Sequence, residues 1–223
     1  MKTKLVIFTI LMAAGLSAAS AQTVTFAVDF GAGSSQIYSG TFGGTTAGEW
    51  SGLNAASLGY PQSADASITL SNVTLTFTGG SYGAYDVGAS NGGPADALLK
   101  DFFYAPGGDT SNFTISGLLP TQTLTLSFVG SNQPFVSDVT FGGNTIVVPG
   151  NATADSGFTS IATVNGVSAS TFNGSWTGEI GNEGDLAGAE ITITTVPEPS
   201  TYAMLGFGLC GLVALRFRRR HVS

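Results

Sequence analysis

Short runs in which apolar residues alternate with threonine and serine dominate the middle of the chain, between residues 22 and 195. Every second residue of Thr23–Phe30 is valine or phenylalanine, and Thr69–Thr78 and Thr121–Val129 repeat this alternation. Successive side chains of a β-strand point to opposite faces of its sheet, so this period places apolar groups on one face and hydroxyls on the other. The pattern therefore predicts half-buried strands rather than helices.

Turn residues separate the alternating runs at short intervals. Gly142-Gly143-Asn144 and Pro149-Gly150-Asn151 are typical separators, because glycine and asparagine tolerate the backbone conformations of tight turns. Many short strands joined in this way indicate an antiparallel sandwich. We therefore predict an all-β fold, a single antiparallel β-sandwich of the jelly-roll type. Further strands are expected at Val136–Phe141, Thr145–Val148, Phe158–Val164 and Glu190–Thr195.

Three segments depart from the strand pattern. Leu98 and Phe102 lie one helical turn apart, so Pro94–Tyr104 is expected to be one short helix or a turn into a strand. The glycine-rich stretches Gly31–Gly48 and Gly79–Gly93 are expected to be long loops. Loops on a rigid sandwich often carry binding residues, although surface loops without a binding role are the alternative.

Residues 22–195 contain neither cysteine nor histidine, because Cys210 and His221 are the only ones in the chain. This segment therefore has no disulfide, no serine–histidine or cysteine–histidine nucleophile and no histidine-based zinc or iron site. Its stability must come from burial and sheet pairing. Carboxylates, hydroxyls, amides and aromatic rings remain, and they suit sugar recognition, calcium binding or a carboxylate-pair glycosidase.

The same segment is strongly acidic. Lys100 is its only basic residue, whereas it holds thirteen of the fourteen acids of the chain, which gives a formal net charge of −12. Such a surface repels phosphate groups, so the composition excludes nucleic acid and anionic lipid headgroups as partners of this segment.

The N-terminus has the three parts of a secretory signal peptide. Lys2 and Lys4 form a positive region, Leu5–Leu16 is apolar, and Ala19 and Ala21 provide the small residues of a cleavage site. We predict a signal peptide over residues 1–21, cleavage before Gln22 and passage through the Sec translocation machinery.

Residues 196–223 place a short polar motif before an apolar run and an arginine cluster. Pro197, Glu198 and Pro199 form the motif, and its prolines favour an extended, accessible backbone. A transmembrane helix is predicted over residues 202–217, with interfacial side chains completing a span somewhat shorter than the bilayer core. Four arginines at its end are expected to hold the C-terminus in the cytoplasm: Arg216, Arg218, Arg219 and Arg220.

This tail, from Val196 to Arg220, resembles the PEP-CTERM sorting signal of bacterial surface and exported proteins. Its motif corresponds to Pro197, Glu198 and Pro199, and its basic cluster to the four arginines. The resemblance implies processing by an exosortase, a membrane-embedded protease or transpeptidase, in bacteria that make extracellular polysaccharide. We expect a transient membrane anchor with residues 22–195 outside the membrane, followed by attachment at or release from the cell surface or matrix.

A second resemblance lies in residues 22–195. Asp29-Phe30-Gly31, Phe113–Pro120 leading into Leu124–Phe128, and Gly188–Ile193 resemble strands and turns of galactose-binding-domain-like jelly rolls, such as malectin and discoidin modules. The resemblance implies a jelly roll, and no sugar-contacting residue carries over to a position in this chain.

Two kinds of side chain are candidates for ligand contacts. Trp50 and Trp176 are expected to be buried in the core, the alternative being an exposed ring that stacks on a sugar. Oxygen ligands for calcium are offered by Asp101 with Asp109, by Asn151 with Asp155, and by Glu179, Glu183 and Asp185. Their spacing does not match an EF-hand loop, so we predict no metal and no cofactor, with a structural calcium as the alternative.

Three classes of function fit these observations. The first, which we favour, is a non-enzymatic surface or matrix protein whose sandwich binds or packs within extracellular polysaccharide. The second is a carboxylate-dependent glycoside hydrolase, although no apolar pocket that would raise a carboxyl pKa is evident in the sequence. The third is ice binding through threonine faces such as Thr74-Leu75-Thr76, but alternation produces such faces on any solvated sheet.

Replacing Pro197, Glu198 and Pro199 together by alanine should block processing, because the apolar run and its arginines remain while the proposed recognition element is lost. The full-length form should then accumulate in the membrane, which immunoblotting of membrane and surface fractions detects. Processing of this variant at the normal rate would show that the motif is not the recognised element.

Overall fold

The computed structural model describes residues 21–31, 37–44, 50–87, 95–153, 156–179 and 182–196. Thr23–Thr194 form one compact unit. The second unit, Met1–Gln22 with Thr195–Ser223, lies almost entirely outside the described residues. The predicted signal peptide, its cleavage site, the Pro-Glu-Pro motif, the transmembrane helix and the four arginines all lie outside them.

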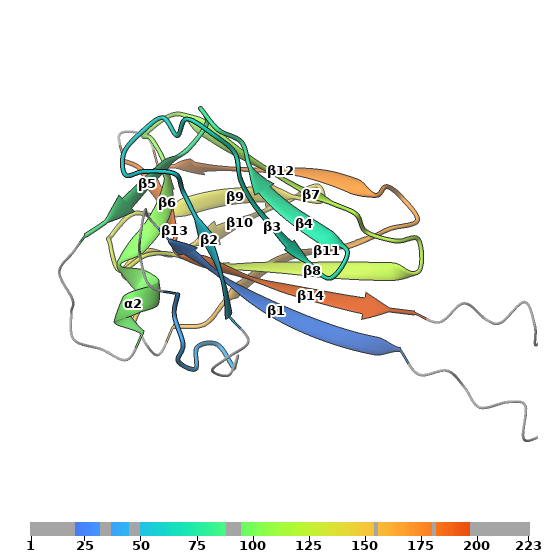
Figure 1. Ribbon diagram of the computed structural model, residues 1–223. Coiled ribbons are helices and arrows are strands. Elements are labelled where there is room, and N and C mark those ends of the chain that lie inside the picture. The colour runs from blue at the N-terminus through green and yellow to red at the C-terminus, as the bar shows by residue number, and fades with distance from the viewer. Residues whose placement is uncertain are drawn as a thin grey trace, which may run out of the picture. The chain divides into compact units, whose positions relative to one another are not determined.

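Thr23–Thr194 fold into two facing β-sheets with a small third sheet at one end (Figure 1). The first sheet has the order β11 (Thr159–Asn165), β8 (Gln122–Val129), β14 (Gly188–Thr195), β1 (Gln22–Gly31) and β2 (Trp50–Asn54). The second has the order β10 (Asn144–Val148), β9 (Ser137–Phe141), β12 (Thr171–Gly178), β7 (Thr110–Ser116), β4 (Val73–Phe77) and β3 (Ala66–Leu70). The third is β13 (Gly184–Leu186), β6 (Asp101–Ala105) and β5 (Gly83–Asp86).

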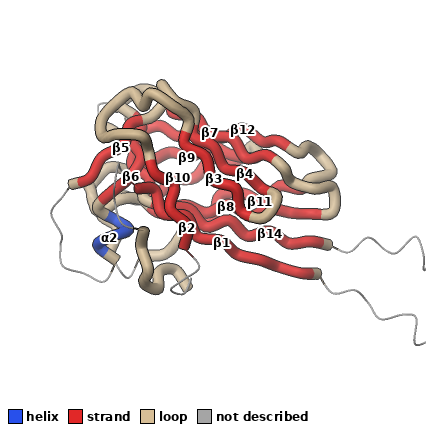
Figure 2. The backbone as a smooth tube through the Cα atoms, viewed as in Figure 1, coloured by secondary structure: helices blue, strands red, loops and turns tan. Residues whose placement is uncertain are grey.

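The predicted all-β, antiparallel class is confirmed (Figure 2). The strands expected from the period-two runs are present, and a turn at Ser71 and Asn72 divides the run from Thr69 to Thr78 into β3 and β4. One pair differs from the expectation, because β2 lies parallel to β1, with Ala27 opposite Trp50 and Gly31 opposite Asn54. The resemblance to galactose-binding modules stays a prediction.

Glycine-rich segments contain strands that the sequence did not indicate. β5 lies inside Gly79–Gly93, so the prediction of one uninterrupted loop there was wrong. The stretch Pro94–Tyr104 contains both expected alternatives, because the short helix α2 (Asp96–Leu99) leads directly into β6.

β12 includes Gly174, and the ring of Phe113 fills the space that a Cβ at Gly174 would occupy, so the glycine lets an aromatic ring pack against the strand.

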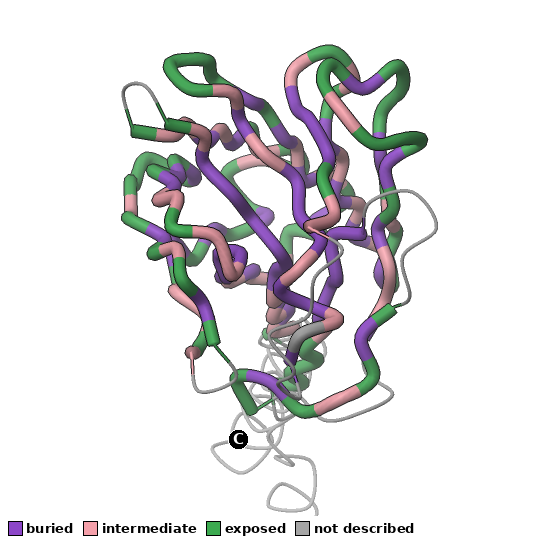
Figure 3. The backbone as a smooth tube through the Cα atoms, turned by 90° about the vertical axis from the view of Figure 1, so that its left-hand side faces the viewer, coloured by how far each residue is buried: buried purple, intermediate pink, exposed green. Residues whose placement is uncertain are grey.

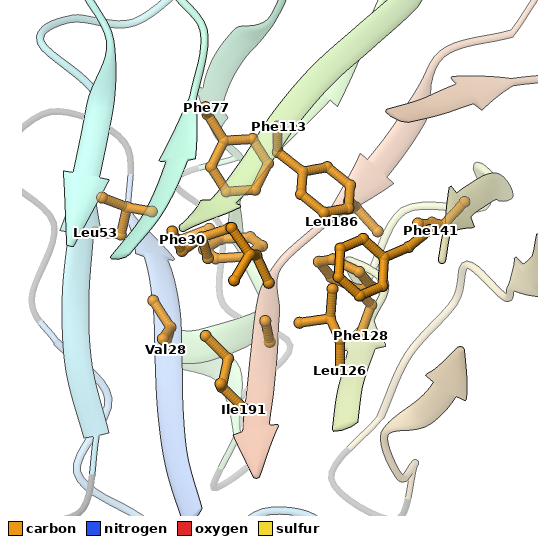
Figure 4. Close-up of a cluster of buried hydrophobic side chains, with 14 of the residues drawn as sticks. Val28, Phe30, Leu53, Phe77, Phe113, Leu126, Phe128, Phe141, Leu186 and Ile191 are labelled. Carbon is orange, nitrogen blue, oxygen red and sulfur yellow. The ribbon is translucent and has the colours of Figure 1, made fainter. Parts of the chain in front are cut away.

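Aromatic side chains from all three sheets meet in the main core (Figure 4). Phe30 of the first sheet lies edge-on to Phe77 of the second at 5.0 Å between ring centroids, and stacks on Phe103 of the third at 5.2 Å. Phe77 also packs edge-on against Trp176 at 5.2 Å. Full burial of such a side chain contributes about 2–3 kcal/mol, and the edge-on and offset arrangements add to it. Because this segment has no disulfide, the aromatic cluster contributes strongly to holding the three sheets together.

A second apolar layer covers the outer face of the first sheet. Tyr38 and Phe42 from the segment 37–44 and Leu98 of α2 pack there with Trp50 and Ala27. The second half of β1 is therefore buried on both faces, although its first half has an exposed side. Alternation in the sequence predicts one buried face, whereas this layer buries the other face too.

The solvated faces of the sheets carry paired hydroxyls. Thr69 and Thr74 are 2.8 Å apart across β3 and β4, and Thr125 and Thr163 are 2.7 Å apart across β8 and β11. Such cross-strand pairs stabilise a register modestly. The threonines that the alternation placed opposite the core thus hydrogen-bond to one another across neighbouring strands.

The first strand of the sandwich, β1, begins beside the end of the last strand, β14. Thr23 and Thr194 hydrogen-bond through their hydroxyls at 3.0 Å, and this end of β1 and β14 lies opposite the end that carries β5 and α2 (Figure 1). Viewed from the β5 and α2 end, exposed residues mark the loops and buried segments run through the interior (Figure 3). The described chain therefore enters and leaves the sandwich at one end.

Candidate functional site

Three tyrosines gather on the outer face of the third sheet and the loop beside it. In β6, Phe103 points into the main core, so its neighbours Phe102 and Tyr104 take the opposite face. Tyr85 of β5 lies opposite Phe102 in the register and is 50% exposed. Tyr60 precedes β3 in the chain, is 43% exposed and lies 6.4 Å from Tyr104 between ring centroids. We call Tyr60, Tyr85 and Tyr104 the tyrosine face.

The loop that carries Tyr60 is held rigidly against β5. Gly59 exchanges two backbone hydrogen bonds with Ala84, at 2.8 and 3.1 Å. The buried Gln62 side chain donates through Nε2 to the carbonyl oxygens of Ser57 and Gly59, at 2.8 and 2.7 Å. A buried amide that satisfies backbone groups fixes the conformation of a loop. Tyr60 is therefore presented by a preformed loop.

The ring of Tyr104 lies over Gly83, the residue opposite it in β5. A Cβ built at Gly83 would meet Tyr104 Cε1 at 2.3 Å, so any larger residue would displace the ring. Burial raises the pKa of the Tyr104 hydroxyl, and the nearby Glu183, Tyr60, Asp185 and Tyr85 raise it further. Tyr104 therefore stays neutral and keeps its hydroxyl as a hydrogen-bond donor at neutral pH.

Two carboxyl groups border the tyrosine face. Asp185 of β13 lies opposite Tyr104 in the register and is fully buried, and its Oδ2 accepts a 2.9 Å hydrogen bond from Ser131 Oγ. Burial raises the pKa of Asp185 to about 8, the Ser131 hydrogen bond opposes this shift, and Glu183 adds to it. Glu183 is half-buried, and burial raises its pKa as well. The sequence did not indicate this burial of two carboxyl groups.

The β13 strand is anchored from behind by the main core. Trp176 Nε1 donates to the Gly184 carbonyl oxygen at 3.0 Å, and Ser137 Oγ donates to the Asp185 carbonyl oxygen at 3.0 Å. Both donors belong to the second sheet, so the position of the carboxyl groups is tied to the sandwich itself. The face is a surface built on rigid strands, which favours precise binding.

The predicted ligand residues have a mixed outcome. Trp50 and Trp176 are buried, at 8% and 0% exposure, which confirms the expectation that they belong to the core. Asp101 begins β6 and is buried, whereas Asp109 follows the other end of the strand and is exposed, so they do not form a common site. Asp155 lies outside the described residues, and within the described ranges no group of three or more His, Cys, Asp and Glu side chains is suited to a metal ion.

The tyrosines were missed because two of them lie where no strand was expected. Tyr85 belongs to the unpredicted β5, and Tyr60 is brought to this sheet by backbone pairing of its loop, as between Gly59 and Ala84. A signal was present for Tyr104, since a strand that buries Phe103 must turn the next side chain outward. Assignment of β6 as a strand would have placed Tyr104 on the surface.

Comparison with known families identifies the C-terminal tail. Residues 195–220 match the family described as the PEP-CTERM protein-sorting motif. The chain thus carries the sorting motif expected from its sequence, which marks an exported, surface-directed protein targeted by an exosortase. No curated protein matches the chain. In the part of the chain that the structure describes, no helix is long and apolar enough to cross a membrane.

Asp185→Asn should flatten the pH dependence of stability. The folded-state pKa of Asp185 is raised from 3.8 to about 8, so the native state keeps a proton that the unfolded chain releases. The stability that this proton contributes is fully present below about pH 4 and is lost as the pH rises towards 8. Urea denaturation of the wild type should therefore give a larger free energy of unfolding at pH 5 than at pH 8, and a smaller difference for the variant.

The exposed Asp138→Asn variant is the matched control, because it removes one acid from the surface. High salt should be used in all arms, since it screens repulsion between surface acids much more than it affects a buried group. Equal pH dependence in Asp185→Asn and the wild type would contradict the assignment of a raised pKa to this residue.

Proposed function

We propose that this exosortase-targeted protein is cleaved at its sorting motif and binds neutral extracellular polysaccharide through the tyrosine face. The observation that carries the proposal is the location of exposed aromatic rings. Among the described residues, Tyr60 and Tyr85 are the exposed aromatic side chains, and both lie on this one face beside Tyr104. Exposed rings on a preformed surface commonly mark a binding site.

Tyrosine suits a sugar ligand in two ways. Its ring offers a flat apolar surface to the C–H groups of a pyranose, and its hydroxyl hydrogen-bonds at the edge. The Glu183 carboxylate beside Tyr104 adds an acceptor for sugar hydroxyls. Because Tyr60 and Tyr85 are each held on a fixed backbone, binding costs little ordering of the protein.

The charge of the sandwich selects among polysaccharides. Residues 22–195 have a formal net charge of −12, so the surrounding field repels uronate, sulfate and phosphate groups. Neutral hexose chains carry no such penalty. The ligand class that fits this face is therefore an uncharged polysaccharide with exposed pyranose faces.

The position of the face fits a protein that is attached at its C-terminus. The sorting motif follows β14, whose last residues lie beside the start of β1. The tyrosine face lies on the third sheet, at the opposite end of the sandwich (Figure 1). Attachment through the tail therefore begins at a part of the sandwich remote from the proposed binding residues.

A glycoside hydrolase is the second candidate, because Glu183 and Asp185 form a neighbouring carboxyl pair with raised pKa values. An acid with a raised pKa is a feature of such enzymes. The burial of Asp185 favours a structural role instead, since a fully buried carboxyl hydrogen-bonded to Ser131 is not accessible to a sugar. We therefore assign polysaccharide binding without catalysis.

Tyr60→Ala and Tyr85→Ala should each weaken polysaccharide binding by roughly tenfold, which corresponds to about 1.4 kcal/mol of lost ring contact. Tyr85→Phe should bind nearly as well as the wild type, because it keeps the ring. A glycan array of neutral and acidic polysaccharides, followed by titration of the strongest ligand, measures both effects. Val167→Ala, at a residue 77% exposed on another loop, is the matched control.

Unchanged binding by the double variant Tyr60→Ala/Tyr85→Ala would contradict the location of the site. Selective binding of acidic polysaccharides would contradict the charge argument. Release of shorter sugars from a bound polysaccharide would contradict the non-enzymatic assignment, and loss of that release in Glu183→Gln would support the hydrolase.

A further inference from the structure

Two buried carboxyl groups lie near each other, one in β1 and the other at the start of β6. Asp29 of β1 is 1% exposed, and Asp101, the first residue of β6, is 0% exposed. Burial and the charge of Asp101 together raise the pKa of Asp29 to about 8, and only the hydrogen bond from Tyr38 opposes this. Two neighbouring carboxylates in such surroundings are costly unless a cation or a proton compensates them.

One oxygen of Asp29 has no partner. Its Oδ2 accepts a 2.7 Å hydrogen bond from the Tyr38 backbone N–H, whereas its Oδ1 is buried without any hydrogen bond. Such an atom is rare in a folded protein and marks a place where a ligand or ion is expected. The Asp29 side chain shares its face of β1 with Gly31, two residues further along the strand.

The Asn54 side chain occupies the position that a side chain at Gly31 would take. A Cβ built at Gly31 would lie 2.0 Å from Asn54 Oδ1 and 3.6 Å from Asp101 Oδ2. Asn54 is opposite Gly31 in the parallel β1–β2 register and is exposed, so this position borders the surface. The absence of a side chain at Gly31 thus allows an amide oxygen and a carboxylate oxygen to approach the same point.

We propose that Asp29, Asp101 and Asn54 bind a calcium ion beside Gly31. All three side chains offer oxygen atoms, the ligands that hard divalent cations prefer, and two carboxylates supply the charge that matches Ca²⁺. Magnesium fits less well, because it demands a strict octahedron and gives up its water reluctantly. Asn54 at the surface gives the ion a route of entry, and water can complete the coordination.

The ion would tie separate parts of the chain together. Asp29 belongs to β1, Asn54 to β2 and Asp101 to the third sheet, and Asp29 also holds the Tyr38 backbone of the outer layer. Calcium at this position therefore fixes the parallel β1–β2 edge to β6, in a segment that has no disulfide to do so. This role is independent of polysaccharide binding at the tyrosine face.

Calcium titration of the purified full-length chain in detergent tests the proposal. After treatment with EDTA and buffer exchange, the wild type should bind one Ca²⁺ in isothermal titration calorimetry, and its thermal midpoint should rise with added CaCl₂. MgCl₂ at the same concentration should raise the midpoint much less. Asp29→Asn should abolish both the binding heat and the calcium-dependent rise, whereas the exposed control Asp138→Asn should keep both.

Asn54→Ala keeps the test decisive if Asp29→Asn does not fold, because Asn54 is exposed and its loss leaves both buried acids in place. This variant should bind Ca²⁺ at least about tenfold more weakly than the wild type, because it lacks one oxygen ligand. Absence of saturable binding by the wild type at millimolar CaCl₂ would overturn the proposal and favour a shared proton between the two acids. If Asn54→Ala or Asp29→Asn bound Ca²⁺ with wild-type affinity, the calcium site would lie elsewhere in the protein.

Discussion

The packing of Phe30 against Phe77 and Phe103 is the interaction on which this structure depends. Each ring comes from a different sheet, so one contact set fixes the two facing sheets and the third sheet to one another. A segment with no cysteine has no covalent bond between distant strands to share this role. Removal of any of these rings would open a cavity at the junction of all three sheets.

Both candidate sites follow from what this core does to neighbouring positions. Burial of Phe103 turns Tyr104 outward on the third sheet, where it joins Tyr60 and Tyr85. Burial of Phe30 turns Asp29 to the opposite face of β1, where the outer layer covers it and Asp101 lies near. Strand alternation thus produces a solvated aromatic surface at one place and a buried acidic pair at another.

The sequence predicted the strands with strict alternation, because a half-buried strand has a period of two that needs no knowledge of its partners. It did not predict β2 or β5, since pairing with β1 and β6 rather than their own composition makes them strands. Alternation places Asp29 opposite the apolar face of β1, and its burial depends on Tyr38, Phe42 and α2, which fold over β1 from later in the chain. The sorting motif was predicted from the sequence and the family match confirms it, because its order of motif, apolar run and arginines is written in consecutive residues.

Hydrogen–deuterium exchange of the full-length chain, with and without a bound neutral polysaccharide, would locate the binding surface. We expect slower exchange in Ser57–Gln62, in β5 and in β6, where the tyrosine face lies, and unchanged exchange in β10 and β11. Slower exchange confined to β10 and β11, or to the threonine-bearing faces of the sheets, would contradict this expectation and move the binding site to another part of the sandwich.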